Sequence, residues 1–380
     1  MLFAQAASTD DTGKACDAAL AARNIKSAQL ECGKALSNAQ KLAQDGGVAS
    51  SLTLASAYYA NGRFYLLAGL GGKAEVSFLA ANALWAKYLG KDHLQVAESL
   101  TNAAEAMLMQ NKMNEAEPLL LRALEIRDKA VGQKSEKSAA SRHALGMLYF
   151  RMDKPAQAES LFRQEVAILE ELKGLDAPET AVACNNLGFI YYRGGKVREA
   201  EPLFRKSIAI LDKVAVKDDV RLLDPLLNYA SLLVDTGQPF DAEKLLLRAL
   251  VIREKQGGAE SIDVADLHNR LGVLYQRANS VVTAEQELRK ALKIREGLLG
   301  VNNLLHAESC SNLGLLLLRQ NRLSEALPLM RHAVAVTEVL TGSKSLITKQ
   351  RWDNLEQLYV AMVRQASIKP ITPSIAVQKE

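Results

Sequence analysis

The stretch Cys184–Leu211, CNNLGFIYYRGGKVREAEPLFRKSIAIL, holds two apolar segments separated by a Gly-Gly pair. In the first segment, helical spacing relates Leu187, Ile190 and Tyr191. In the second segment, one face of a helix would collect Ala200, Leu203, Phe204, Ser207, Ile208 and Leu211. The pattern therefore predicts two helices joined by a tight turn.

Gly188 lies inside the first apolar segment, where glycine costs a helix about 1 kcal/mol relative to alanine. Gly188 and Ala200 would face each other near the turn between the two helices. Two small residues at these positions let the helix backbones approach closely. We therefore interpret Gly188 as a packing residue, and a ligand-binding glycine is the alternative.

The same pattern returns every 42 residues along most of the chain. The alanine of "EAEP" has counterparts at Ala74, Ala116, Ala158, Ala200, Ala242, Ala284 and Ala326. Twelve residues earlier, a small residue recurs at Ala104, Gly146, Gly188, Ala230, Gly272 and Gly314. A fixed period of this length indicates a repeat array. Because each repeat consists of two helices, we predict an all-α fold, a right-handed α-solenoid of stacked antiparallel helix pairs.

Two further columns mark where the helices should end. Between the two helices of a repeat stand residues that tolerate a left-handed backbone: Asn111, Asp153, Gly195, Gly237, Asn279 and Asn321. A helix C-terminal cap requires such a residue. A glycine column recurs after the second helix at Gly90, Gly132, Gly174, Gly258, Gly300 and Gly342, with Val216 as the exception.

The segment NNLGFIYYRGGKVREAEPLFRKSIAIL resembles a tetratricopeptide repeat, in a version longer than the common one of about 34 residues. The pieces "LGKDHLQVAESL" and "LKGLDAPETAVACNNLG" resemble the kinesin-light-chain variety of this repeat. The resemblance covers about residues 48–365. No heptad coiled coil precedes the repeats, so the nearer resemblance is to bacterial proteins with repeats of this type. The resemblance implies a binding scaffold.

The pattern divides the chain into five segments. We expect residues 1–10 to be a remnant of a signal peptide, 11–45 an N-terminal helical hairpin, 48–342 the repeat array, 347–364 a capping helix and 366–380 a disordered tail. In the first clear repeat, Ala55 precedes Ala74 by 19 residues instead of 12, so we expect a seven-residue insertion at "YLLAGLG".

Composition and motifs argue for protein binding more than for chemistry. Basic and acidic residues nearly balance, 47 against 43, which gives no indication of a nucleic-acid partner. No apolar run is long enough to predict a transmembrane segment. The five histidines form no metal-ligand spacing, and no phosphate-binding loop or nucleophile motif occurs. We therefore expect no metal, no cofactor and no enzymatic activity, and an enzyme subunit is the least favoured alternative.

Cys16 and Cys32 lie equally far from Asn24, in the expected turn of the first hairpin. Antiparallel helices would bring these two cysteines level, so a disulfide is expected if the protein resides in an oxidising compartment. The start "MLFAQAASTDD" contains a sequence that resembles a signal-peptidase site, although its apolar stretch is short. We therefore expect a periplasmic or secreted protein, with a cytoplasmic one as the alternative. Cys184 and Cys310 are expected to be buried free thiols.

A candidate binding groove lies on the first helix of each repeat. Two residues before the small-residue column stand Asn102, Asn186, Asn228, Asn312 and Asn354. Seven residues further on, and thus on the same helix face, stand Arg151, Arg193, Arg277 and Arg319. Asparagine can pair with a peptide backbone and arginine with carboxylates. In kinesin light chain, which this chain resembles, similar asparagines hold acidic cargo peptides.

We therefore predict that residues 140–320 bind an extended protein segment with acidic side chains or a free C-terminus. Alternatively, the asparagines bond to neighbouring helices and the arginines are solvated. A structural or assembly factor of the cell envelope, acting through its convex face or end caps, is the second functional hypothesis. The column of Glu75, Glu117, Glu159, Glu201, Glu243 and Glu285, with arginines four residues on, is interpreted as a solvated helix face.

Overall fold

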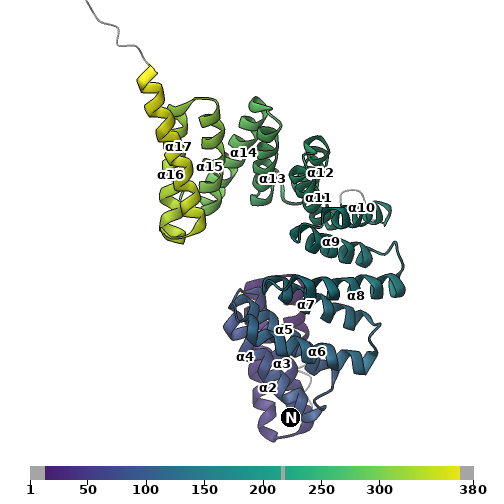
Figure 1. The fold of residues 1–380 in the computed structure, drawn as a ribbon. Coiled ribbons are helices and arrows are strands. Elements are labelled where there is room, and N and C mark those ends of the chain that lie inside the picture. Colours follow the sequence, from purple (N-terminus) through teal and green to yellow (C-terminus); the bar gives the residue numbers. More distant parts are fainter. Residues whose placement is uncertain (1–12, 215–218, 369–380) are drawn as a thin grey trace, which may run out of the picture. The chain divides into compact units, whose positions relative to one another are not determined.

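The computed structural model describes residues 13–214 and 219–368, and these are helical apart from short turns (Figure 1). Expectations for residues 1–10, for Val216 and for residues 369–380 lie outside the described residues. After a helix over residues 13–21, the elements are α2 (Ile25–Leu42), η1 (Ala43–Asp45), α3 (Val48–Leu67), α4 (Gly71–Tyr88), α5 (Leu94–Met109), α6 (Met113–Val131), α7 (Glu136–Arg151), α8 (Pro155–Lys173), α9 (Pro178–Arg193), α10 (Val197–Val214), η2 (Val220–Leu222), α11 (Leu223–Asp235), α12 (Pro239–Gly257), α13 (Ile262–Arg277), α14 (Val281–Leu299), α15 (Leu304–Arg319), α16 (Leu323–Thr341) and α17 (Leu346–Ile368).

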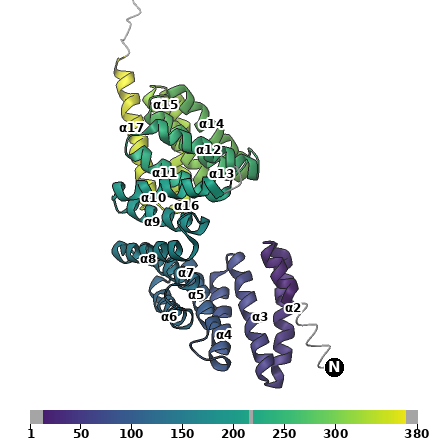
Figure 2. The same cartoon turned by 90° about the vertical axis from the view of Figure 1, so that its right-hand side faces the viewer.

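The helices form consecutive packed pairs, which confirms the predicted α-solenoid of stacked helix pairs. The chain divides into two compact units, residues 1–203 and 204–380. In the first unit α3 packs on α4, α5 on α6 and α7 on α8. In the second unit the pairs are α11 with α12, α13 with α14 and α15 with α16. Figure 2 shows α2, α3 and α4 lying side by side.

The turn inside each pair has the predicted left-handed residue. Asn111, Asp153, Asn279 and Asn321 have φ values of 62°, 56°, 60° and 59°, and Gly195 and Gly237 have 74° and 76°. The next amide then bonds back to the helix, as Lys196 N does to Tyr191 O at 2.8 Å. This is the Schellman arrangement that closes a helix C-terminus. The predicted role of this column is confirmed.

The small-residue column brings the two helices of a pair together. A Cβ atom added at Gly146 would come 2.9 Å from the Phe162 ring, and one at Gly272 would come 2.6 Å from Leu288 Cγ. Such distances are shorter than van der Waals contact. Glycine at these positions therefore leaves room for a large side chain of the second helix.

The expected seven-residue insertion in the first repeat is wrong. Gly62, twelve residues before Ala74, occupies the small-residue position, because a Cβ there would come 2.7 Å from Phe78. Gly69 supplies the left-handed turn residue, with a φ of 75°. Ala55 belongs instead to a second column of small residues, which lies seven residues, or two helical turns, earlier.

The glutamate column does more than form a solvated helix face. Each of several glutamates reaches a basic side chain in the turn of the next pair: Glu75–Lys112 at 2.9 Å, Glu117–Lys154 at 3.3 Å, Glu159–Lys196 at 2.6 Å and Glu285–Arg322 at 2.6 Å. Pairs four residues apart on one helix also occur, at Arg163 and Arg289. The column therefore sets the register between successive repeats as well as stabilising single helices.

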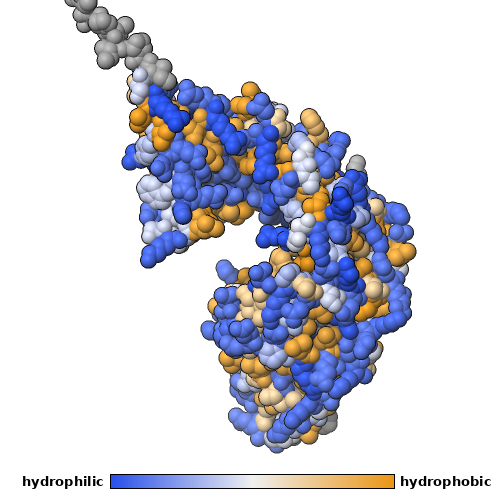
Figure 3. Space-filling model, in the orientation of Figure 1, coloured by the Kyte–Doolittle hydropathy of each residue, from blue (hydrophilic) through white to orange (hydrophobic). Residues whose placement is uncertain are grey.

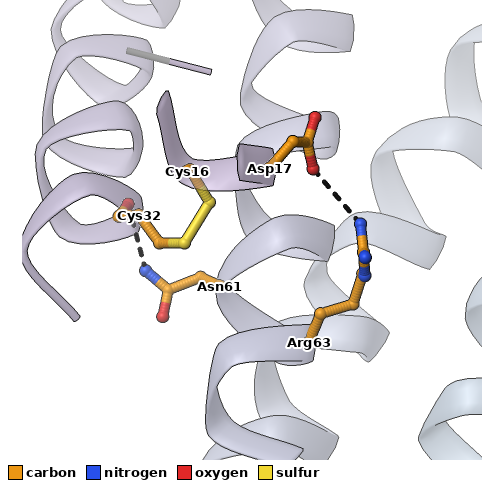
Figure 4. Close-up of a disulfide and its surroundings, with 5 residues drawn as sticks. All are labelled: Cys16, Asp17, Cys32, Asn61 and Arg63. Atoms are coloured by element: carbon orange, nitrogen blue, oxygen red, sulfur yellow. Dashed lines mark hydrogen bonds and ion pairs between the residues drawn. A yellow bond between two sulfur atoms is a disulfide. The ribbon is translucent and has the colours of Figure 1, made fainter. Parts of the chain in front are cut away.

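The first hairpin is fastened by a disulfide between Cys16 and Cys32, whose Cα atoms lie 4.7 Å apart (Figure 4). Both cysteines are fully buried against Phe64 of α3. Asn61 of α3 donates a hydrogen bond to the carbonyl oxygen of Cys32, at 3.5 Å, and Arg63 forms an ion pair with Asp17. The disulfide-linked hairpin thus packs on the first repeat as a further helix pair.

Candidate functional site

The first helices of neighbouring repeats contact one another directly. This holds for α3 with α5, for α13 with α15 and for α15 with α17. In a stack of helix pairs, the side on which successive helices approach most closely is the inner side of the curve. The predicted asparagines and arginines all lie on these first helices, or on α17, which occupies the same position.

Two of the predicted asparagines spend their amide groups on the preceding repeat. Asn102 donates a hydrogen bond to Tyr59 Oη at 2.7 Å, and Tyr59 in turn donates to Glu98 at 2.7 Å. Asn312 donates to Asn269 Oδ1 at 2.9 Å. Both bonds join residues 43 positions apart. These asparagines align adjacent first helices, as the alternative interpretation of the ladder proposed.

The remaining positions of the ladder differ from one repeat to the next. Asn186, Asn228 and Asn354 are half-buried, and Arg151, Arg193, Arg277 and Arg319 are exposed. Arg277 forms a long ion pair, 3.5 Å, with Asp235, which interrupts the arginine column. Asn228 is engaged in an interaction of its own. Asn186 has no side-chain partner among the described residues.

In the first unit, α7 and α9 together present an apolar surface between two arginines. The Phe150 and Phe189 rings meet edge to face, with centroids 5.5 Å apart. We call this the α7/α9 surface and define it as Met147, Phe150 and Arg151 of α7 with Val182, Asn186, Phe189 and Arg193 of α9. Both phenylalanines are half-buried and Val182 is 42% exposed.

The charge of the α7/α9 surface is positive at one edge. Arg151 and Arg193 each end their helix, and neither forms an ion pair with another described residue. Two unpaired guanidinium groups can each bind a carboxylate through two hydrogen bonds. An apolar patch with aromatic rings at its centre can bury an apolar side chain of a ligand.

The apolar members of this surface were not singled out by the sequence analysis. Val182, Asn186, Phe189 and Arg193 follow one another at steps of four, three and four residues, which is one face of a helix. The signal was therefore present in the repeat containing Asn186. The contact of Phe189 with Phe150 was not, because it joins two different repeats.

The second unit presents a different inner surface, with carboxylates where the α7/α9 surface has Ala140 and Val182. Asp266 and Glu308 stand at this position on α13 and α15. Arg295 of α14, which is fully buried, reaches both of them at 3.4 and 3.2 Å and also bonds Leu305 O at 2.8 Å. Asp266 additionally pairs with Arg270 at 2.6 Å. This part of the inner surface is therefore of mixed charge.

Two open hollows lie outside the predicted ladder. One, of about 680 Å³, lies beside α17 and is lined by Asn321, Asp353, Glu356, Gln357, Val360, Ala361, Arg364 and Gln365. The other, of about 390 Å³, lies in the first unit over Leu187 and Tyr191, between α8 and α10. Neither contains a predicted groove residue. In the described ranges, no three His, Cys, Asp or Glu side chains gather in a way that could hold a metal ion.

The tetratricopeptide repeat family model matches residues 53–129, 137–213, 221–297 and 263–339. The chain belongs to the tetratricopeptide repeat family. The matched segments follow the helix pairs of the structure, and this repeat fold is typical of proteins that bind peptides or other proteins. A comparison with curated protein sequences found no match.

Several solved structures share the tetratricopeptide repeat architecture. The apo form of the quorum sensor NprR from B. thuringiensis has a TM-score of 0.63 at 16% identity, and the alignment covers 87% of this chain and 87% of NprR. The apo form of RapI has a TM-score of 0.61 at 9% identity, with 94% and 98% covered. BtubC (BKLC) from P. vanneervenii has a TM-score of 0.53 at 21% identity, with 62% and 93% covered. At these identities the similarity concerns the fold.

None of the helices in the described part of the chain combines the length and the apolar character needed to span a membrane.

Proposed function

We propose that this protein is a non-catalytic scaffold that binds an extended segment of a partner protein on its first helices, with the α7/α9 surface as the main contact. The observation that carries the proposal is the Phe150–Phe189 pair flanked by unpaired Arg151 and Arg193. Asn186, half-buried on the same helix face, would donate to and accept from the backbone of the bound segment.

The chemistry of the α7/α9 surface favours a segment with an apolar side chain followed or preceded by a carboxylate. Ala140 and Val182 occupy the positions that carry Asp224, Asp266 and Glu308 in the second unit. An acidic ligand would therefore meet no row of carboxylates on α7 and α9. A free C-terminus would satisfy the same two arginines as an acidic side chain.

Selection from a display library of random twelve-residue peptides tests the proposal. Peptides retained by the protein should be enriched in an apolar residue within a few positions of Asp, Glu or the C-terminus. Phe189→Ala should retain few of them, because it removes half of the ring pair. Val76→Ala is the matched control, since Val76 is 68% exposed on the second helix α4. Equal retention by the two variants would refute the α7/α9 surface as the site.

We also propose that the protein acts in an oxidising compartment, such as the periplasm or the extracellular space. The support is the buried Cys16–Cys32 disulfide, since such bonds persist where thiols are not kept reduced. Fractionation of cells that express the full-length gene, with the protein detected by antibody, tests this directly. Recovery with the cytoplasmic fraction alone would refute it.

A further inference from the structure

The last helix, α17, is packed on one side only. Leu355 and Leu358 are 2% and 0% exposed and belong to the core cluster formed with α15 and α16. In every complete repeat, the first helix also packs against its own second helix, as α15 does against α16. In the part of the chain that the structure describes, no second helix follows α17.

The side of α17 that faces this position carries large apolar residues at the surface. Trp352, Tyr359 and Val363 are 46%, 42% and 67% exposed. Their spacing of seven and four residues places them on one helix face. The residues 42 positions before Trp352 and Tyr359 are Cys310 and Leu317, which are 1% and 0% exposed. Trp352 and Tyr359 thus stand at core positions of the repeat without a covering element, and apolar surface is visible around α17 in Figure 3.

The sequence that follows α17 alternates between apolar and other residues. In KPITPSIAVQKE, residues 369–380, the apolar positions Ile371, Pro373, Ile375 and Val377 are two apart. An extended chain would place them on one side, roughly 6.6–6.8 Å from one another. Pro370 and Pro373 disfavour a helix. The alternation differs from the lack of pattern that would favour a disordered tail.

We propose that residues 369–380 fold back along α17 as an extended segment and cover Trp352, Tyr359 and Val363. The reach is sufficient: the path from Ile368 back to Trp352 is about 24 Å along the helix axis, whereas twelve extended residues span up to about 40 Å. The apolar side chains from Ile371 to Val377 would extend over about 20 Å. The three exposed residues of α17 occupy about 16 Å of the axis.

The proposal gives the repeat array a cap supplied by its own chain. A solenoid end that exposes apolar surface tends to associate with other copies unless it is covered. The folded-back segment would take the place of the missing second helix and prevent the stack from extending onto another copy. The inner surfaces proposed to bind a partner are not involved, so the two proposals stand or fall separately.

Tryptophan fluorescence of the full chain tests the proposal, because the sequence has only two tryptophans and Trp85 is 3% exposed. Quenching by acrylamide therefore reports mainly on Trp352. The double variant Ile371→Asp/Ile375→Asp should raise the quenching constant about twofold, since it exposes the indole ring. Thr372→Asp/Ser374→Asp adds the same charge on the other side of the alternation and should leave the quenching constant unchanged.

Two results would overturn the proposal. One is equal quenching in the parent and in both double variants, which would mean that the segment does not cover Trp352. The other is shielding of Trp352 that increases with protein concentration and persists in both variants, with a dimer mass in light scattering. That result would assign the surface to a second copy of the chain.

Discussion

Lys196 Nζ lies 2.6 Å from Glu159 Oε2, and this ion pair joins the turn after α9 to the second helix of the preceding repeat. The contact recurs 42 residues earlier and twice more in the described chain, so it belongs to the repeat design. The hydrogen bond from Lys196 holds the pKa of Glu159 below its ordinary value. The pair therefore fixes how far one repeat is displaced from the next.

Reversal of one charge in this pair should destabilise the first unit, and reversal of both should restore it. Glu159→Lys places two positive charges together, whereas Glu159→Lys/Lys196→Glu recovers an opposite pair. Denaturation curves at low salt should show the rescue, and the difference should shrink as salt screens the charges. Additive effects of the two substitutions at low salt would contradict a direct coupling.

Gly272→Ala should lower the free energy of unfolding by about 1–3 kcal/mol, because the added methyl group overpacks the contact with Leu288. Gly297→Ala in the next helix is the matched control, since nothing lies within 4 Å of a Cβ atom there. In the control, the higher helix propensity of alanine should stabilise the protein by up to about 1 kcal/mol. Chemical denaturation of both variants measures the contrast, and equal shifts would refute the packing role of the column.

His143 should make stability depend on pH near neutrality. Its ring contacts Glu165 at 3.2 Å, and the hydrogen bond from this carboxylate raises the pKa of His143. Because the folded-state pKa is the higher one, the stabilisation is complete below the unfolded value of about 6.5 and is lost as pH rises through the folded value.

Denaturation curves of the parent and of His143→Gln between about pH 5 and 9 test this expectation. The stability difference between the two proteins should be largest at the acidic end and should diminish as the pH rises. A difference that stays constant over this range would exclude a charged histidine as its source.

Alkylation followed by mass measurement should distinguish the four cysteines. Denatured, unreduced protein from its native compartment should take up two adducts, on Cys184 and Cys310, and four after reduction. In the folded protein Cys310 should not react, because burial raises its pKa to about 12. Four adducts without reduction would show that the disulfide does not form.

Much of the fold could be predicted because the repeat multiplies every signal. The left-handed turn residues are one example, since Asn111 alone would be ambiguous but six equivalents at a 42-residue period are not. The period also produced an error. Two columns of small residues lie two helical turns apart, so Ala55 was aligned with the wrong one and an insertion was expected where Gly62 keeps the regular spacing.

The candidate site was less predictable, because its contacts join residues of different repeats. The asparagine ladder is uniform in sequence, yet Asn102 and Asn312 bond to the preceding first helix whereas Asn186 has no described partner. The deciding difference lies one repeat earlier, at Tyr59 and Asn269. Likewise, Phe189 gained its interest only through Phe150, which lies 39 residues away.

The affinity of a selected acidic peptide for the full chain tests the central claim most directly. In fluorescence polarisation with a labelled peptide, Arg151→Ala/Arg193→Ala should weaken binding at least tenfold, since charged hydrogen bonds contribute about 1.5–3 kcal/mol each. Arg198→Ala, on the exposed face of the second helix α10, should bind as the parent does. If the double variant folds and binds the peptide with undiminished affinity, the α7/α9 surface is not the binding site.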